Sequence, residues 1–318
     1  MIYFKFPFNE KLFTIQKNGT EKVVEFYPFN GNQKISFKGK IENPKDYEND
    51  EFLTSILENS GHLIEESKKE YFENLENIIK IIEVANLPKI VYSRRKLVPF
   101  QNIDIQKSFK NLCKTYPNAF RYVFQQYGIA WMGAFSEVLG KYNKKTGTFE
   151  TMSLAGTLPV SENWTSKEIE EQKPVTNFIA NILQNYTSEV EISETYDHIS
   201  GNIKHLRTDF KATIQEDQVE NIIKELHPTP AVCGIPKEFC KEVIAKYEKY
   251  PRELYAGYIR IETDTEILYF VNLRCARIFK NSVHIFVGGG ITAQSDVEKE
   301  WRETELKSEA ILKNLVIS

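Results

Sequence analysis

Long apolar runs are absent from this chain of 318 residues. No window approaches the roughly 18 consecutive apolar residues of a membrane-spanning helix, so we expect no membrane partner. The N-terminus also lacks the basic-then-apolar layout of a signal peptide. The four cysteines are scattered without a CxxC pair, which argues against a zinc site or a disulfide framework. We therefore expect a cytoplasmic protein with reduced thiols.

An excess of positive charge is absent as well. The net charge is −3 and the pI is near 6.1. Nucleic-acid-binding domains are normally basic, so we expect no nucleic-acid partner. What the sequence does have is an apolar content of 41% and an aromatic content of 13%, which is enough for a sizeable core. Repeats, low-complexity tracts and linkers that would divide the chain are missing.

Meandering strands with helices beside them predict an α+β protein rather than a doubly wound sheet. Short strands separated by Asn-Gly turns are expected over 2–38, and apolar spacing predicts a long helix over 63–86. Further helices are predicted at 104–115, 165–185, 216–226 and 236–249. Further strands are predicted from residue 89 onward and at 119–125, 129–132, 148–154, 188–193, 202–211, 253–263, 266–274 and 277–287.

The stretch 286–307 carries the densest group of candidate binding residues. It reads as the end of an apolar strand, a triple-glycine turn at 288–290, and a helix that a capping box of Ser295 and Glu298 starts near Asp296. Along that helix Glu300, Glu303 and Lys307 are three and four residues apart, which stacks them on one face.

This spacing predicts a cation site beside an anion site. Neighbouring carboxylates repel each other unless a cation lies between them, and hard divalent ions prefer oxygen ligands. Glycines can bring bare backbone N–H groups against an anion. A Mg²⁺ that bridges the protein to a carboxylate substrate would use both. The alternative interpretation is a salt-bridged surface helix after an ordinary turn, since both patterns are common.

Three other stretches hold candidate residues, each with a structural alternative. Glu168 and Glu171 share a helix face, although acidic residues are favourable in any first helical turn. Glu137 follows an apolar stretch and could simply mark a strand's exit to solvent. Lys89 heads a strand and could be an ordinary exposed lysine.

From about residue 88 to its end, the chain resembles the chorismate-utilising enzymes. That family includes isochorismate, salicylate, anthranilate and aminodeoxychorismate synthases. The matching stretches, in the family's order, are KIVYSRR (89–95), GAFSE (133–137), LAGT (154–157), KEIEE (167–171), LHPTPA (226–231), RELYAG (252–257), LRCA (273–276), VGGGI (287–291) and EWRETELK (300–307). Departures from the family pattern are Phe135-Ser136 before the glutamate and Gln172 after Glu171.

The resemblance implies the aminodeoxychorismate synthase-like fold, with layered, mostly antiparallel sheets, flanking helices and an active site between them. Residues 1–85 would be its variable N-terminal part and 86–318 its chorismate-binding catalytic region, together one compact unit. The implied roles are a base at Lys89, an acid at Glu137, Mg²⁺ ligands at Glu171, Glu300 and Glu303, and substrate contacts at Gly156, Thr157, His205, Tyr255, Arg274, Gly289, Gly290 and Lys307.

The residue at position 89 indicates the branch of the family. Ammonia-using members usually carry glutamine there, and water-using members carry lysine. Adding water to C2 of chorismate requires a base, and a lysine can serve when burial and nearby cations, such as Arg94 or Arg95, favour its neutral form. The position of Ala155 holds a nucleophilic lysine in many aminodeoxychorismate synthases. The resemblance therefore implies an isochorismate synthase that is Mg²⁺-dependent and acts as a monomer, for menaquinone or siderophore synthesis.

Three alternatives stay open at this point. A salicylate synthase would use the same groups and go on to eliminate pyruvate. An ammonia-using synthase is disfavoured by Lys89 and by the lack of an evident glutaminase domain. A non-catalytic chorismate-binding protein would be expected to have lost the base, the acid or a metal ligand, and this sequence keeps all of them.

Overall fold

The computed structural model describes residues 1–16, 19, 22–31, 33–44, 60–200 and 203–318. In this part of the chain the strands form two sheets of nine strands each, and the strand pairs are antiparallel. The first sheet has the order β14 (Gly234–Ile235), β6 (Lys89–Pro99), β18 (Ser282–Ile291), β17 (Cys275–Ile278), β8 (Ile129–Phe135), β7 (Phe120–Gln126), β1 (Ile2–Lys5), β2 (Phe13–Gln16) and β5 (Lys40–Glu42).

The second sheet has the order β11 (Val190–Ile192), β13 (Ile203–Thr213), β10 (Thr148–Pro159), β9 (Val138–Asn143), β16 (Glu266–Val271), β15 (Tyr258–Glu262), β3 (Lys22–Tyr27) and β4 (Ile35–Lys38), with β12 (Tyr196–Ser200) beside β13. The helices are α1 (Lys68–Ala85), α2 (Ile105–Thr115), α3 (Ser166–Gln184), α4 (Glu216–Leu226), α5 (Lys237–Tyr247) and α6 (Val297–Leu312). Within the described residues, no helix combines the length and the apolar character needed to cross a membrane.

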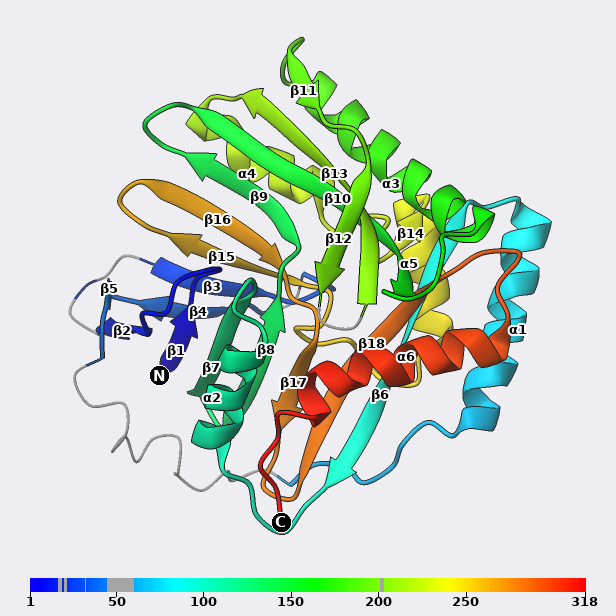
Figure 1. The fold of residues 1–318 in the computed structure, drawn as a ribbon, viewed down its shortest axis with the longest axis horizontal. Coiled ribbons are helices and arrows are strands. Elements are labelled where there is room, and N and C mark those ends of the chain that lie inside the picture. The colour runs from blue at the N-terminus through cyan, green and yellow to red at the C-terminus, as the bar shows by residue number, and fades with distance from the viewer. Residues whose placement is uncertain (17–18, 20–21, 32, 45–59, 201–202) are drawn as a thin grey trace.

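The two sheets pack face to face, and helices cover their outer faces (Figure 1). Helices α3 and α4 pack on β10 and β9 of the second sheet, whereas α6 and α2 pack on β18, β7 and β8 of the first. Aromatic contacts join the sheets, for example Phe26 to Phe124, with ring centroids 4.7 Å apart. Strand β8 alternates accordingly: Trp131 enters the core between the sheets, and Met132 enters the core under α2.

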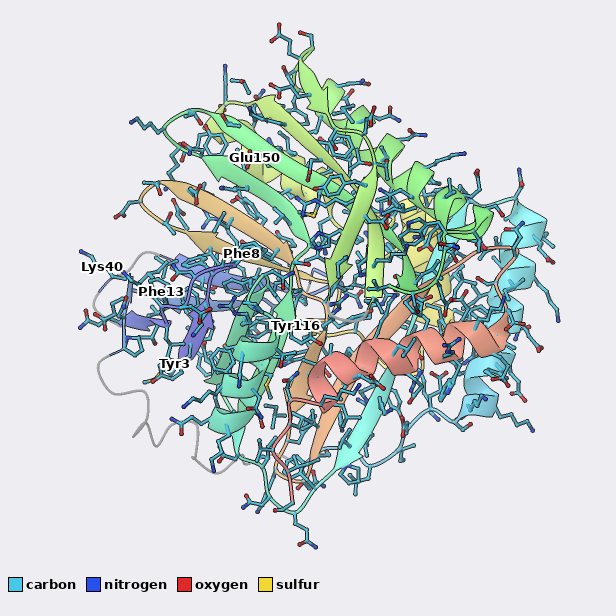
Figure 2. All side chains as sticks on the ribbon, viewed as in Figure 1. Tyr3, Phe8, Phe13, Lys40, Tyr116 and Glu150 are labelled. Carbon is cyan, nitrogen blue, oxygen red and sulfur yellow. The ribbon has the colours of Figure 1, made fainter. Side chains whose placement is uncertain are left out.

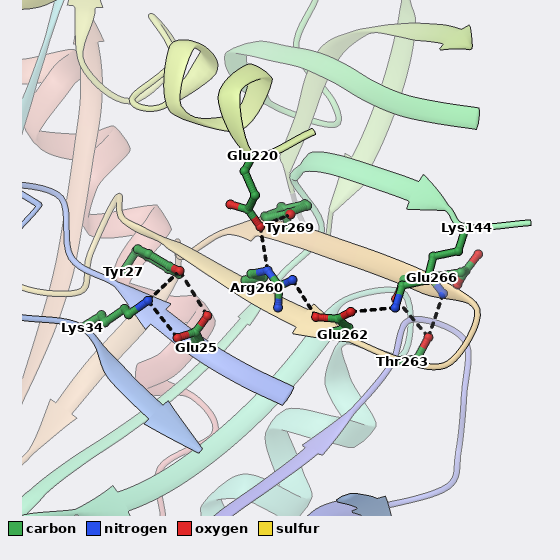
Figure 3. A network of polar contacts seen from close by, with 10 residues as sticks. All are labelled: Glu25, Tyr27, Lys34, Lys144, Glu220, Arg260, Glu262, Thr263, Glu266 and Tyr269. Atoms are coloured by element: carbon green, nitrogen blue, oxygen red, sulfur yellow. Dashed lines mark hydrogen bonds and ion pairs between the residues drawn. The ribbon is translucent and has the colours of Figure 1, made fainter. Parts of the chain in front are cut away.

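The N-terminal strands belong to both sheets. Strand β1 pairs with β7, and β3 pairs with β15. Tyr3 and Phe13 lie in this region, where β1 and β2 extend the first sheet beyond β7 (Figure 2). In the second sheet a polar network ties β15 to helix α4 and to the loop after β9. Arg260 donates to Glu220 and Glu262, and Lys144 also donates to Glu262 (Figure 3).

Besides the single-residue link at Gly39 between β4 and β5, two short crossovers carry the chain between the sheets. Ser136 and Glu137 connect β8 of the first sheet to β9 of the second, and residues 272–274 connect β16 back to β17. Each crossover accepts a hydrogen bond from the strand that leads into the other one. Val271 N of β16 donates to Glu137 O (3.1 Å), and Ala134 N of β8 donates to Arg274 O (3.2 Å). The fold therefore fixes Glu137 and Arg274 next to each other, between the sheets.

The α+β prediction and the family fold are confirmed. The predicted helices are present, although α1 begins at Lys68, after a capping box of Ser67 and Glu70. Asn30-Gly31 lies in the turn between β3 and β4, and Asn18 falls outside the described residues. Strands β9 and β12 were not predicted. The predicted strand 277–287 is wrong, because a turn at 279–281 separates β17 from β18.

The predicted glycine turn is also wrong. Gly288, Gly289 and Gly290 continue strand β18 and pair residue by residue with Ser93, Tyr92 and Val91 of β6. The helix starts where expected, but its cap is Asp296, whose side chain accepts from Lys299 N at 2.9 Å. Ser295 donates instead to the Glu300 carboxylate at 2.7 Å.

Candidate active site

A cavity between the two sheets collects most of the predicted site residues. It is lined by residues of β6, β18, β10, α3, β13, α6 and both crossovers. The predicted residues among its lining are Glu137, Gly156, Thr157, Glu171, His205, Tyr255, Arg274, Gly289, Gly290 and Lys307. Apolar lining residues that the sequence interpretation missed include Val91, Leu273 and Phe286. Segments far apart in the chain thus share one enclosed space.

One wall of the cavity is an open strand edge. Strand β18 pairs with β17 over Val283–Ile285, and within the described residues no strand pairs with its later residues on that side. Lys307 Nζ donates to Gly288 O at 2.9 Å, which shows that this carbonyl points away from β6. Since backbone groups alternate along a strand, the N–H groups of Gly288 and Gly290 face the open edge and that of Gly289 faces β6. The predicted anion contact therefore fits the amide of Gly290, with Gly288 as its partner.

The same glycines make room for carboxylates. A Cβ at Gly290 would lie 2.2 Å from Oε1 of Glu171, and a Cβ at Gly289 would lie 3.1 Å from Oε2 of Glu300. The distance from that second Cβ to Oε1 of Glu303 would be 3.5 Å. Side chains at these two positions would occupy the space of the predicted metal ligands, so glycine is required for the carboxylates to come this close.

Lysines hold two of the three carboxylates. Lys89, which is fully buried, donates to Glu171 at 2.8 Å. Lys307 donates to Glu303 at 2.7 Å. Among the described residues, no three His, Cys, Asp or Glu side chains are arranged to hold a metal ion. Glu300 and Glu303 line an adjoining cavity that shares Thr157 and Lys307 with the first.

Glu137 has the properties of an acid that is protonated near neutral pH. Its side chain is buried, and this burial raises its pKa from 4.5 to about 7, against the opposing effect of Lys89, Arg274 and Lys307. Those three cations come from β6, the β16–β17 crossover and α6. Phe135, which is buried and also lines the cavity, supplies part of the apolar setting. Met132 does not, because it faces α2.

His205 links Arg274 to the irregular part of β10 that contains Gly156. Burial first, and then the charges of Arg274 and Lys307, lower its pKa well below 6.5, so the ring is neutral. Arg274 Nη2, which can only donate, lies 3.0 Å from His205 Nε2. The ring proton is therefore assigned to Nδ1, which lies 2.9 Å from Gly156 O and 3.2 Å from the Thr157 hydroxyl. Arg274 itself has a left-handed backbone (φ 43°).

The remaining predicted residues divide between the cavity and its surroundings. Ala155 lines the cavity, and Tyr255 stacks on Phe286 at its wall. His227 lies elsewhere, at the end of α4, with Nε2 3.0 Å from Ala256 O. The prediction that Arg94 or Arg95 assists Lys89 is not supported: the guanidinium groups stack on Trp301 and Tyr250, respectively, and Arg94 also bonds to Glu305.

The family model described as "Chorismate binding enzyme" matches residues 30–316. The chain belongs to this family. Similar proteins include isochorismate synthase EntC of Escherichia coli K12, which is 33% identical over 150 residues, covering 46% of this chain and 38% of that protein. Isochorismate synthase MenF of Bacillus subtilis is 26% identical over 266 residues, covering 78% of this chain and 56% of that protein. The matches thus span less than two thirds of either relative.

Solved structures of the chorismate-binding family share the fold. The menaquinone-specific isochorismate synthase MenF of Escherichia coli superposes with a TM-score of 0.80 at 19% identity, over 98% of this chain and 88% of that one. A structure titled as a putative 2,3-dihydroxybenzoate-specific isochorismate synthase, DhbC from Bacillus anthracis, gives 0.79 at 21% identity, over 98% and 95%. At these identities the likeness establishes the architecture alone.

Proposed function

We propose that the protein is an isochorismate synthase, which converts chorismate to isochorismate by adding water at C2 as the C4 hydroxyl leaves. The observation that carries the proposal is a pair of opposite groups: Glu137 lines the cavity, and Lys89 lies directly behind the lining residues Gly290 and Glu171. Glu137 is a buried acid with a pKa of about 7, and Lys89 is a buried amine close enough for its charge to act on that carboxyl. The relatives named isochorismate synthase support the same reaction.

Glu137 serves as the general acid. Hydroxide is a poor leaving group, so the departing C4 oxygen must receive a proton in the transition state. A carboxyl group whose pKa is near 7 is partly protonated at neutral pH and is still acidic enough to donate. Its neighbours Lys89, Arg274 and Lys307 then stabilise the carboxylate that the transfer leaves behind.

Lys89 serves as the general base that takes the proton from the attacking water. In the present arrangement Lys89 is an ammonium group bound to Glu171, so it must leave this partner and also lose a proton before it can act as a base. The reaction is balanced between the two groups: one proton enters Lys89 and one leaves Glu137. Restoring the starting state requires a proton to return from the first to the second through solvent or product.

The two carboxylates of chorismate match two sets of donors. The N–H groups of Gly288 and Gly290 on the open edge of β18, together with Arg274 and Lys307, can hold the enolpyruvyl carboxylate. The ring carboxylate would lie beside Gly156 and Thr157, towards Glu171. Both clamps are formed from backbone or from half-buried side chains that already line the cavity, so substrate binding would need little rearrangement.

Magnesium fits the donor set in chemical type. Glu171, Glu303 and Glu300 would hold it, since Mg²⁺ favours a few carboxylates plus substrate oxygens and water. When bound, the ion would neutralise and orient the ring carboxylate. The lysine contacts of Glu171 and Glu303 show that these carboxylates already attract cations. If these carboxylates held the ion, Lys89 and Lys307 would no longer be their cationic partners.

The enzyme is proposed to act as a monomer. The four cysteines are free and buried, which supports a reducing, cytoplasmic setting. The product would enter menaquinone or siderophore synthesis. One structural neighbour is titled as menaquinone-specific and another as 2,3-dihydroxybenzoate-specific, and both are titled as isochorismate synthases.

The test is product analysis after incubation with chorismate and Mg²⁺. Isochorismate as the sole product is the expected result. Salicylate with pyruvate would redirect the proposal to a salicylate synthase, and anthranilate formed only with ammonia would indicate the other branch. Lys89→Met and Glu137→Gln should each abolish turnover. Glu150→Gln, a change at an exposed carboxylate on β10, is the matched control and should turn over normally.

A further inference from the structure

Strand β12 makes a side-chain contact with the crossover that carries Glu137. His198 Nε2 lies 3.2 Å from the hydroxyl of Ser136, the residue directly before the acid. His198 is opposite His205 in the β12–β13 register, so both rings project from the same face of the ribbon. His205 reaches Arg274 at the neighbouring crossover. His198 of β12 therefore contacts the crossover at Ser136–Glu137, and His205 of β13 contacts the crossover at 272–274.

The crossover is short, and paired strand residues lie on both sides of it, Phe135 in β8 and Val138 in β9. It is only two residues long, Ser136 and Glu137, between β8 and β9. The Glu137 carbonyl accepts from Val271 N, which fixes the backbone after the acid. The contact to His198 fixes the backbone before it. Because Ser136 also lines the cavity, a shift at this residue would move the Glu137 carboxyl relative to the substrate.

The His198 ring is suited to a neutral hydrogen bond. Burial and the nearby charges of Arg207 and Arg274 lower its pKa, so the ring carries no charge at neutral pH. Either ring nitrogen of a neutral imidazole can be the acceptor, and a serine hydroxyl rotates to suit it. The contact thus restrains the crossover without placing a further charge beside the acid, whose raised pKa depends on an apolar setting.

We infer that His198 is a positioning residue for the general acid: through the Ser136 hydroxyl it fixes the crossover so that Glu137 meets the departing C4 oxygen of chorismate. This inference rests on the proposed function. It assigns His198 no contact with substrate. A positioning effect of this kind lowers kcat and leaves KM nearly unchanged, because binding depends on Arg274, Lys307 and the glycine edge.

The test is a double-mutant cycle read in steady-state kinetics with chorismate and Mg²⁺. His198→Ala and Ser136→Ala are each expected to lower kcat about tenfold, since a small misplacement of a reacting group costs one to two orders of magnitude. The double variant is expected to match either single variant, because both remove the same contact. His198→Gln places an amide nitrogen near the position of Nε2 and should recover most of kcat.

Ile199→Ala is the matched control. Its side chain is 56% exposed on the same strand and should leave kcat unchanged. Unchanged kcat in His198→Ala, losses that add up in the double variant, or an equal loss in Ile199→Ala would each overturn the positioning role. A wild-type protein that does not turn over chorismate would instead overturn the proposed function and this inference with it, so the two failures are distinguishable.

Discussion

Glu137→Gln should stabilise the folded protein while removing its activity. The pKa of Glu137 rises from 4.5 to about 7 on folding. This rise corresponds to about 3 kcal/mol, since each tenfold change in proton affinity is about 1.4 kcal/mol. A carboxyl whose folded pKa lies above its unfolded value binds its proton more tightly when folded. Stability is therefore lost as the pH rises from 4.5 to about 7, and the full cost applies above that range.

Glutamine keeps the shape of the acid and carries no charge. Glu137→Gln is thus expected to unfold with a free energy about 3 kcal/mol higher than wild type at pH 8, and nearly equal to it at pH 4. The assay is urea denaturation at both pH values without Mg²⁺, with Glu150→Gln as the exposed control. The same difference at both pH values, or none at either, would refute the assignment of Glu137 as a buried acid.

Three further predictions concern the rest of the site. Lys89→Met removes the cation from a buried carboxylate and should lower the unfolding free energy by about 3 kcal/mol in urea, whereas Lys89→Met/Glu171→Gln should recover most of this loss. Gly290→Ala forces a Cβ to within 2.2 Å of Glu171 Oε1 and should lower kcat/KM about 100-fold, whereas Gly289→Ala meets only the end of the Glu300 side chain at 3.1 Å and should cost less. Arg274→Lys keeps the charge but loses the forked donor geometry, so the KM for chorismate should rise about tenfold, with a smaller change in kcat. Equal losses in the two Lys89 variants, equal effects of the two glycine changes, or an unchanged KM in Arg274→Lys would contradict the respective prediction.

Local sequence patterns predicted most of the helices but could not predict where the chain passes from one sheet to the other. The start of a helix near Asp296 and the apolar spacing of α1 depend on residues a few positions apart, so they can be read directly from the chain. Strand β9 was missed because Glu137 interrupts the apolar pattern at the point where the chain changes sheets. That interruption is itself the functional feature, because it places a carboxyl between the layers.

The glycine run shows a different limit. Three glycines after an apolar strand predict a turn, yet here they extend β18, because β6 supplies a continuous partner on one side. The need for glycine comes from the carboxylates of α3 and α6, which lie against the strand. These contacts are long-range, so no local pattern contains them. Nor does any local signal connect His198 to Ser136, which are 62 residues apart.

The family resemblance implied that Lys89 is the base, but it did not indicate which residue Lys89 contacts. Its ion pair with Glu171 joins the proposed base to a proposed metal ligand, which neither motif alone predicts. In the same way, the motif at 287–291 indicates an amide contact, but only the strand alternation identifies Gly288 and Gly290 as the residues that face the cavity.

The central claim is that Lys89 and Glu137 direct water to one carbon of chorismate while a hydroxyl leaves another. Its most direct test is turnover of chorismate with Mg²⁺ in ¹⁸O-labelled water, followed by mass analysis of the product. The predicted result is isochorismate with one ¹⁸O atom at the new C2 hydroxyl, and no such product from Lys89→Met or Glu137→Gln. Unlabelled isochorismate, or labelled product from either variant at the wild-type rate, would contradict the claim.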